Sequence, residues 1–178
     1  DLPSTLENAR KWILIGLYVG QRVSDLLALK PSQLRFIENG VYIDINQQKT
    51  DKYVTVGVVD KEVIQILKKN FPYSISAQLF NRQIKQICQI AGIYEMVSGY
   101  KLCIKTKRKR LGTHPKYSLI SSHDLRRSFA TNYFGKIETP ILMQITGHSK
   151  ESTFLSYIGS QVNKDTYADA FMKVAATL

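Results

Sequence analysis

Hydrophobic residues recur at helical intervals over most of the chain, and the first such stretch covers residues 5–19. Ser4 followed by Glu7 matches a capping box at its start, and Gly20 is predicted to end it. Further helices, each bounded by a capping residue, a glycine or a proline, are predicted at residues 24–29, 60–69, 77–91, 122–134 and 140–146. Asp60 is the predicted cap of the second of these, and either Ser121 or Ser122 that of the fourth. Ser149 is predicted to cap a helix that carries Tyr157, and a final helix is predicted at residues 164–176. The chain is therefore predicted to be mainly helical.

From Arg35 onward the pattern changes to a period of two. Residues 41–45 and 53–56 alternate between apolar and polar positions and are rich in β-branched side chains, as strands are. A turn at residues 38–40 separates the stretch that begins at Arg35 from the first of these segments, and a polar connection at residues 48–52 separates the two segments from each other. The pattern predicts a small three-stranded antiparallel meander. Residues 101–115, by contrast, are basic and are predicted to be irregular. The whole pattern indicates a mainly helical α+β fold.

At 178 residues the chain is long enough for one domain with its own hydrophobic core. Its net charge of +11 and its pI near 9.7 indicate an anionic partner, for which nucleic acid and an anionic membrane are the candidates. A membrane-spanning helix needs about 18 or more consecutive apolar residues, and the sequence contains no such run. Nucleic acid is therefore the preferred interpretation, and no membrane partner is expected.

The cysteines and histidines do not have the spacing of a metal site. Cys88 and Cys103 are far apart, so they give neither a disulfide framework nor a zinc-ligand pattern, and they suit a reducing cytosol. His114, His123 and His148 are likewise scattered along the chain. The sequence predicts no structural metal.

Residues from which phosphodiester chemistry can be built stand in compact groups. Arg22 lies two residues after Gly20, the glycine that is predicted to end the first helix. His123 and Arg126 are three residues apart, so on a helix they share one face. His148 stands nine residues before Tyr157. A guanidinium binds two phosphate oxygens with paired hydrogen bonds and stays charged at any working pH. When a tyrosine oxygen attacks phosphorus, the transition state is pentacoordinate and carries extra negative charge. Two arginines around the phosphorus would stabilise that charge.

The order Arg, His, Arg, His, Tyr and the local spacing of these residues resemble the catalytic domain of the tyrosine recombinases, the phage-integrase family. The resemblance extends over about residues 6–173. It implies that residues 1–178 form a mainly helical α+β catalytic domain with a small three-stranded antiparallel sheet and a second short hairpin. Members of the family normally carry an N-terminal helical DNA-binding domain, so the chain is expected to be a fragment that lacks this core-binding domain.

The resemblance also implies a mechanism, in which DNA is cut and rejoined without a metal or other cofactor. Tyr157 would attack a backbone phosphorus and give a 3′-phosphotyrosyl ester and a free 5′ hydroxyl. His123 would accept the tyrosine proton. Lys49, in the predicted turn between two strands, would protonate the leaving 5′ oxygen. The residues expected to bind the nonbridging oxygens are Arg22, Arg126 and His148.

Each of these residues also has an ordinary structural interpretation. Arg126 could be a solvated helix charge, His123 a first-turn residue with satisfied hydrogen bonds, His148 a polar loop residue and Lys49 a solubilising turn lysine. Lys52 lies three residues from Lys49 and is an alternative for the turn lysine. Arg22 and Asp25 could form a surface ion pair, which would contribute little to stability. Tyr157 could fill the core, because the chain has ten tyrosines.

Double-stranded DNA is the partner that the resemblance implies, with a homotetramer on DNA for the full-length protein and a monomer for the isolated domain. The basic run at residues 105–110 is expected to lie along DNA phosphates, a sequence-independent contact. Site-specific recombination such as DNA integration, and a cytoplasmic, nucleoid-associated location in a bacterial or phage-type system, follow from the same resemblance. A type IB topoisomerase-like nicking-closing enzyme and a non-catalytic DNA-binding module are the alternatives.

Overall fold

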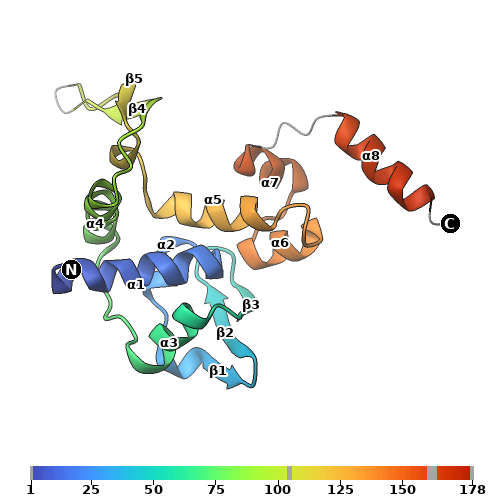
Figure 1. The fold of residues 1–178 in the computed structure, drawn as a ribbon, viewed down its shortest axis with the longest axis horizontal. Helices are drawn as coiled ribbons and strands as arrows, with labels where there is room; N and C mark the ends of the chain where they lie inside the picture. The colour runs from blue at the N-terminus through green and yellow to red at the C-terminus, as the bar shows by residue number, and fades with distance from the viewer. Residues whose placement is uncertain (1, 104–105, 160–163, 177–178) are drawn as a thin grey trace.

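The computed structural model describes residues 2–103, 106–159 and 164–176, whose arrangement is drawn in Figure 1. The helices are α1 (Ser4–Val19), α2 (Val23–Leu27), η1 (Pro31–Gln33), α3 (Lys61–Lys69), α4 (Ala77–Ile90), η2 (Lys116–Ser118), α5 (Ser122–Tyr133), α6 (Thr139–Thr146), α7 (Glu151–Ile158) and α8 (Lys164–Ala175). The strands are β1 (Leu34–Ile37), β2 (Gly40–Gln47), β3 (Lys52–Val58), β4 (Met96–Leu102) and β5 (Lys109–Pro115). The predicted mainly helical α+β fold is confirmed. None of the described helices is long and apolar enough to cross a membrane.

Helix α1 runs through the middle of the molecule and contacts α3, α4, α5 and β3 (Figure 1). Its buried positions recur every three or four residues, at Ala9, Trp12, Ile15 and Val19. The indole N–H of the fully buried Trp12 donates to the backbone oxygen of Tyr73 at 2.9 Å, so the polar edge of the ring is satisfied inside the core. This face of α1 is the centre of the main hydrophobic core.

The first sheet is antiparallel, with the strand order β1-β2-β3. Ile43 lies opposite Val56 and Ile45 opposite Val54, and all four side chains are buried. Alternate positions of β2 and β3 therefore face the core, as the period of two predicts. The three-stranded meander that the sequence predicts is confirmed.

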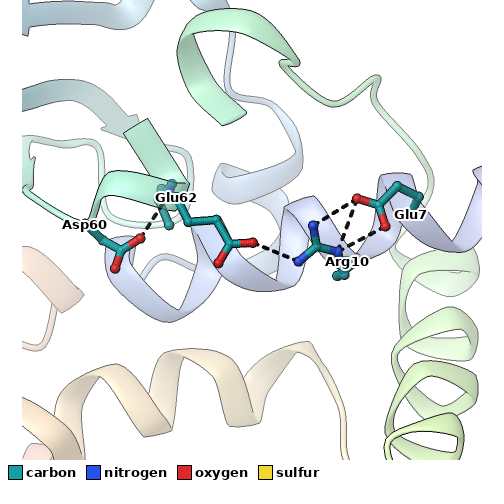
Figure 2. Close-up of polar contacts among 5 residues, drawn as sticks. Glu7, Arg10, Asp60 and Glu62 are labelled. Atoms are coloured by element: carbon teal, nitrogen blue, oxygen red, sulfur yellow. Dashed lines mark hydrogen bonds and ion pairs between the residues drawn. The ribbon is translucent and has the colours of Figure 1, made fainter. Parts of the chain in front are cut away.

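Ion pairs tie α1 to α3 across the surface of this core (Figure 2). Arg10 in α1 binds Glu7 one turn earlier, at 3.0 Å, and Glu62 in α3, at 2.9 Å. Asp60 caps α3, because its side chain accepts a hydrogen bond from the backbone N–H of Val63 at 3.0 Å. The predicted cap at Asp60 is therefore confirmed.

Caps at the starts of α1 and α7 differ from the prediction. Pro3 occupies the N-cap of α1, so Ser4 is the first helical residue and Glu7 forms the ion pair described above. Lys150 occupies the N-cap of α7, where Ser149 was expected. In both cases the helix starts within two residues of the predicted cap, and only the residue in the cap differs.

Most of residues 101–115, expected to be irregular, belong to a second antiparallel sheet made of β4 and β5. Lys101 lies opposite Arg110 in this hairpin, and Tyr100 lies opposite Leu111. Both Tyr100 and Leu111 are exposed, so the alternation that marks a half-buried strand is weak here. The second short hairpin is confirmed, and it stands at one end of the molecule beyond α4 (Figure 1).

A smaller cluster joins α5, α6 and α7, in which Phe129, Ala130, Leu142 and Phe154 are buried together. Phe129 also faces the end of α1, where Gly20 has a φ of 65°. A Cβ on Gly20 would lie 2.3 Å from the Phe129 ring, so both the space and the backbone conformation require glycine. This close approach places the α1–α2 junction beside α5.

Candidate active site

A hollow of about 530 Å³ lies where the α1–α2 junction, the β2–β3 turn, α5 and the α6–α7 junction meet. The structure brings all six predicted site residues to its walls: Arg22, Lys49, His123, Arg126, His148 and Tyr157. They come from segments that are distant in sequence, and the two core clusters described above fix these segments relative to one another.

Arg22 occupies the N-cap of α2 and lines the hollow. Its Nη1 atom is buried and has no hydrogen-bond partner among the residues that the structure describes. The interpretation of Arg22 and Asp25 as a surface ion pair is wrong. Asp25 is buried, and its Oδ1 instead accepts a hydrogen bond from the backbone N–H of Gln48 at 3.0 Å. A buried cationic nitrogen without a partner is costly, so this guanidinium is poised to bind an anion that enters the hollow.

Arg126 is buried, and its hydrogen bonds join the α1–α2 junction to the end of α6. Its Nη1 donates to the backbone oxygen of Gly20 at 3.2 Å, and its Nη2 donates to the backbone oxygen of Thr146. Burial and the nearby Arg22 lower the pKa of Arg126 to about 10, which still leaves it charged at neutral pH. A guanidinium has five N–H groups, so Arg126 can bridge these two carbonyls and still donate to an anion.

His123 lies in the first turn of α5, which begins with a capping box between Ser121 and Asp124. The box confirms the first of the two caps predicted for this helix. Burial, and next the charge of Arg127, lower the pKa of His123 below its usual value. The imidazole is therefore neutral at neutral pH, the form that can accept a proton.

His148 directly follows Gly147, which ends α6 in the left-handed conformation with a φ of 65°. The hydroxyl of Thr146 donates to the backbone oxygen of Leu142 at 2.6 Å, so its oxygen accepts from Nδ1–H of His148, at 2.8 Å. Burial and the charge of Arg126 lower the pKa of His148 to about 4. The Nδ1 atom is thus engaged, and Nε2 is the nitrogen left for other contacts.

Tyr157 packs its ring between two histidines and under an arginine. The ring centroids lie 4.9 Å from His123 and 5.0 Å from His148, and the Arg127 guanidinium lies 5.5 Å from the ring centroid. The hydroxyl donates to the backbone oxygen of His123 at 3.3 Å. Burial raises the pKa of Tyr157, and the positive charge of Arg126 partly offsets this. The phenol is therefore protonated at neutral pH, and it needs a base to become a nucleophile.

The two lysines of the β2–β3 connection are separated by the structure. Lys49 lines the hollow with Tyr157 and the arginines. Lys52 lies on a neighbouring hollow together with Glu151, and His148 stands between the two. The geometry supports Lys49 as the lysine of this site.

Sequence reasoning assigned no role to two buried glutamines behind the hollow, Gln21 and Gln47. Gln47 continues the inward-facing positions of β2, after Ile43 and Ile45, and is fully buried. A polar residue at an inward-facing position of a strand was the signal that could have identified it. Gln21 is the neighbour of Arg22 and carries no such signal.

Stability should depend on the protonation of His148. Its pKa is about 4 in the folded chain and about 6.5 when unfolded, so between these values the unfolded chain binds the extra proton. The free energy of unfolding therefore falls as pH falls from 6.5 to 4. Between pH 7 and pH 5, wild type should lose about 1 kcal/mol more than His148→Gln, which is about half of the full linkage value because the ring is partly exposed to solvent. Urea denaturation at both pH values measures this, and equal losses would contradict it.

The chain belongs to the phage integrase family, because a sequence model of that family matches residues 4–164. The match spans all of the residues that line the hollow. No curated protein sequence matches the chain.

Solved recombinase structures share its fold. The XerH site-specific recombinase bound to difH substrate in a pre-cleavage complex has a TM-score of 0.65 at 19% identity, over 96% of this chain and 48% of that one. The Tn1549 transposon integrase in complex with transposon right end DNA has a TM-score of 0.63 at 16% identity, over 95% of this chain and 59% of that one. A lambda integrase dimer bound to a COC′ core site has a TM-score of 0.59 at 18% identity, over 91% of this chain and 54% of that one. This chain thus spans about half the length of the XerH chain.

Proposed function

We propose that the chain is the catalytic domain of a site-specific DNA recombinase, which cuts and rejoins strands through a 3′-phosphotyrosyl intermediate, as in DNA integration. One observation carries the proposal most directly. Arg22, whose Nη1 has no hydrogen-bond partner in the described part of the chain, lines the same hollow as Arg126 and Tyr157. Attack by a phenol on an anionic phosphodiester needs this arrangement.

In this mechanism a DNA phosphate enters the hollow and binds Arg22 and Arg126. The oxygen of Tyr157 attacks phosphorus, the bond from phosphorus to the 5′ oxygen breaks, and a 3′-phosphotyrosyl ester forms. Neutral His123 accepts the phenol proton, and Lys49 donates a proton to the departing 5′ oxygen. The new ester keeps the energy of the broken bond, so rejoining by the reverse steps needs no ATP, metal or other cofactor.

His148 has a narrower role in this scheme. Because Nδ1–H is used by Thr146, the neutral ring has no hydrogen on Nε2 to donate to a phosphate oxygen. A phosphate anion next to Nε2 favours the imidazolium, which does carry that hydrogen. We therefore propose that His148 becomes protonated when DNA binds and then contacts a nonbridging oxygen.

The proposed partner is double-stranded DNA. The net charge of +11 and the DNA complexes of the XerH, lambda and Tn1549 proteins support it. For the full-length protein we propose a homotetramer on DNA. Lambda integrase has been solved as a tetramer bound to a Holliday junction, with a TM-score of 0.51 at 18% identity to this chain. The isolated domain is proposed to be a monomer, and the site of action is proposed to be the cytoplasmic DNA.

The experiment uses the full-length protein and a duplex nicked close to the cleavage site, so that the short cut fragment diffuses away and the covalent complex accumulates. A slowly migrating band on a denaturing gel is expected, and two intact duplexes together should give Holliday junctions. Adduct formation with relaxation of supercoiled DNA but no junctions would indicate a topoisomerase-like enzyme. DNA binding with no adduct would indicate a non-catalytic module.

The exposed basic residues 107–110 of the β4–β5 hairpin should contribute to DNA binding and not to strand cleavage, because they lie outside the hollow. Neutralising all four should weaken DNA binding and make the slope of log K against log salt shallower by up to about 3–4. Single-turnover cleavage at saturating protein should stay nearly unchanged. The control neutralises Lys61, Lys68 and Lys69 of α3, at the other end of the molecule (Figure 1). Equal salt slopes per removed charge in the two variants would place the DNA elsewhere. Lys105 of the same basic run lies outside the described residues.

A further inference from the structure

Two glutamines lie directly behind the hollow and next to residues of the proposed mechanism. Gln21 precedes Arg22, and Gln47 ends β2, two residues before Lys49. Both are almost completely buried, with 2% and 0% of their surface exposed. Buried amides are retained only where their hydrogen bonds are satisfied, so the partners of these two define what they do.

Their hydrogen bonds join three segments. The Nε2 of Gln47 donates to Oε1 of Gln21 and to the backbone oxygen of Ile145, both at 2.8 Å. The Nε2 of Gln21 donates to the same Ile145 oxygen at 2.8 Å and to the backbone oxygen of Val19 at 3.1 Å. Both hydrogens of each amide are therefore used, and the Ile145 oxygen, in the last turn of α6, lies between them.

The second side of Gln47 holds the β2–β3 turn. Its Oε1 accepts the hydroxyl of Thr50 at 2.8 Å, and its backbone oxygen accepts the N–H of Asp51 at 2.8 Å. Lys49 lies between these contacts and is itself exposed, so its position is set by the backbone of the turn and not by packing of its own side chain.

The α6–α7 junction also fits closely onto Gln47. A Cβ on Gly147 would lie 2.2 Å from Oε1 of Gln47, and Gly147 is the residue before His148. Glycine at this place lets the junction approach the glutamine, in a conformation with a φ of 65° that other residues rarely adopt. The pair thus contacts the neighbours of Arg22, Lys49 and His148.

We propose that Gln21 and Gln47 are positioning residues for the cleavage step, which set the Lys49 turn and the Arg22 junction against the end of α6. The proposal rests on the proposed function. An apolar side chain of similar length would fill the space, but it would not fix the register of these segments. A displacement of about 1 Å in a reacting group can cost about 100-fold in rate.

The test compares Gln47→Met and Gln21→Met with Gln83→Met, in the full-length protein. Gln83 is a suitable control because it is also buried, and it donates to the backbone oxygen of Thr5, away from the hollow. Each variant cleaves an ordinary duplex and one in which sulfur replaces the bridging 5′ oxygen. A thiolate leaves without the help of an acid, since a thiol ionises far more readily than an alcohol.

Gln47→Met should cleave the ordinary duplex about 10- to 100-fold more slowly at saturating protein, with unchanged affinity, and the sulfur duplex should restore most of the rate. Gln21→Met should lose a similar factor on both duplexes, because Arg22 is proposed to bind the nonbridging oxygens. Gln83→Met should cleave like wild type. Equal losses for Gln47→Met on the two duplexes, or rates like that of Gln83→Met, would overturn the proposal.

Amide hydrogen exchange gives a readout that does not depend on cleavage. Exchange at Thr50 and Asp51 should become faster in Gln47→Met and stay unchanged in Gln83→Met. Unchanged exchange in Gln47→Met would overturn the positioning role even in a protein that cuts DNA. Faster exchange in a protein whose wild type forms no DNA adduct would instead overturn the proposed function, so the two failures are distinguishable.

Discussion

Replacing Tyr157 by phenylalanine should abolish the covalent protein–DNA adduct, with a loss of at least about 10⁴-fold in single-turnover cleavage. The substitution removes only the oxygen that is proposed to attack phosphorus. In the structure this oxygen donates a hydrogen bond of 3.3 Å to the backbone oxygen of His123, so the free energy of unfolding should fall by only about 0.5–1.5 kcal/mol. The measurement is a nicked-duplex cleavage assay on a denaturing gel, alongside a binding titration.

Tyr133→Phe provides the matched control, because Tyr133 packs against the same small hydrophobic cluster as Tyr157. This variant should form the adduct at the wild-type rate. If Tyr157→Phe still forms the adduct, another tyrosine is the nucleophile and the proposed role of Tyr157 is wrong.

Arg22→Ala should reduce cleavage by about 100- to 1,000-fold at saturating protein, or about 2.7–4 kcal/mol of transition-state stabilisation. Arg22 tests this contact more cleanly than Arg126, whose guanidinium also bridges the backbone oxygens of Gly20 and Thr146. Because Nη1 of Arg22 has no partner among the described residues, its loss should change stability little. Arg22→Lys should recover only a small part of the rate, since an ammonium lacks the planar paired donors.

The control for Arg22 is Arg35→Ala, which removes an arginine that is paired with Asp44 on the sheet at 2.7 Å. This variant should cleave normally at saturation, because Arg35 does not line the hollow. Wild-type cleavage by Arg22→Ala, measured by single-turnover kinetics, would contradict a phosphate contact from this residue.

Most of the fold could be predicted from periodicity, because the elements that pack on the core bury one regular face. The three-stranded sheet is an example, since inward positions such as Ile43 and Val56 are apolar and the neighbouring outward pair, Asp44 and Thr55, is polar. The β4–β5 hairpin gave no such signal because it leaves large apolar residues such as Tyr100 and Leu111 exposed. The cap at Asp60 was predictable because it needs one local hydrogen bond, whereas a proline took the place expected for Ser4.

The residues that line the candidate site could be predicted from the sequence, but the buried residues that hold them in place could not. Intervals within the motifs named the residues that the structure brings to one hollow. They could not separate Lys49 from Lys52, because that choice depends on which way the end of a strand turns. Nor could they reveal Gln21, because its hydrogen bond to Ile145 joins segments 124 positions apart and leaves no local pattern. Gln47 is marked only by its inward-facing position in β2, which indicates burial but not its partners.

The most direct test of the central claim is the chemical identity of both ends at the cut. Full-length protein is trapped on a nicked duplex, the adduct is digested with protease, and the DNA-linked peptide is sequenced by mass spectrometry. The released strand is tested for direct phosphorylation by a polynucleotide kinase. The mechanism predicts a 3′-phosphate ester on the peptide that contains Tyr157, and a released 5′ hydroxyl that accepts phosphate without prior dephosphorylation. A linkage through a 5′ phosphate, or to any other residue, would contradict it.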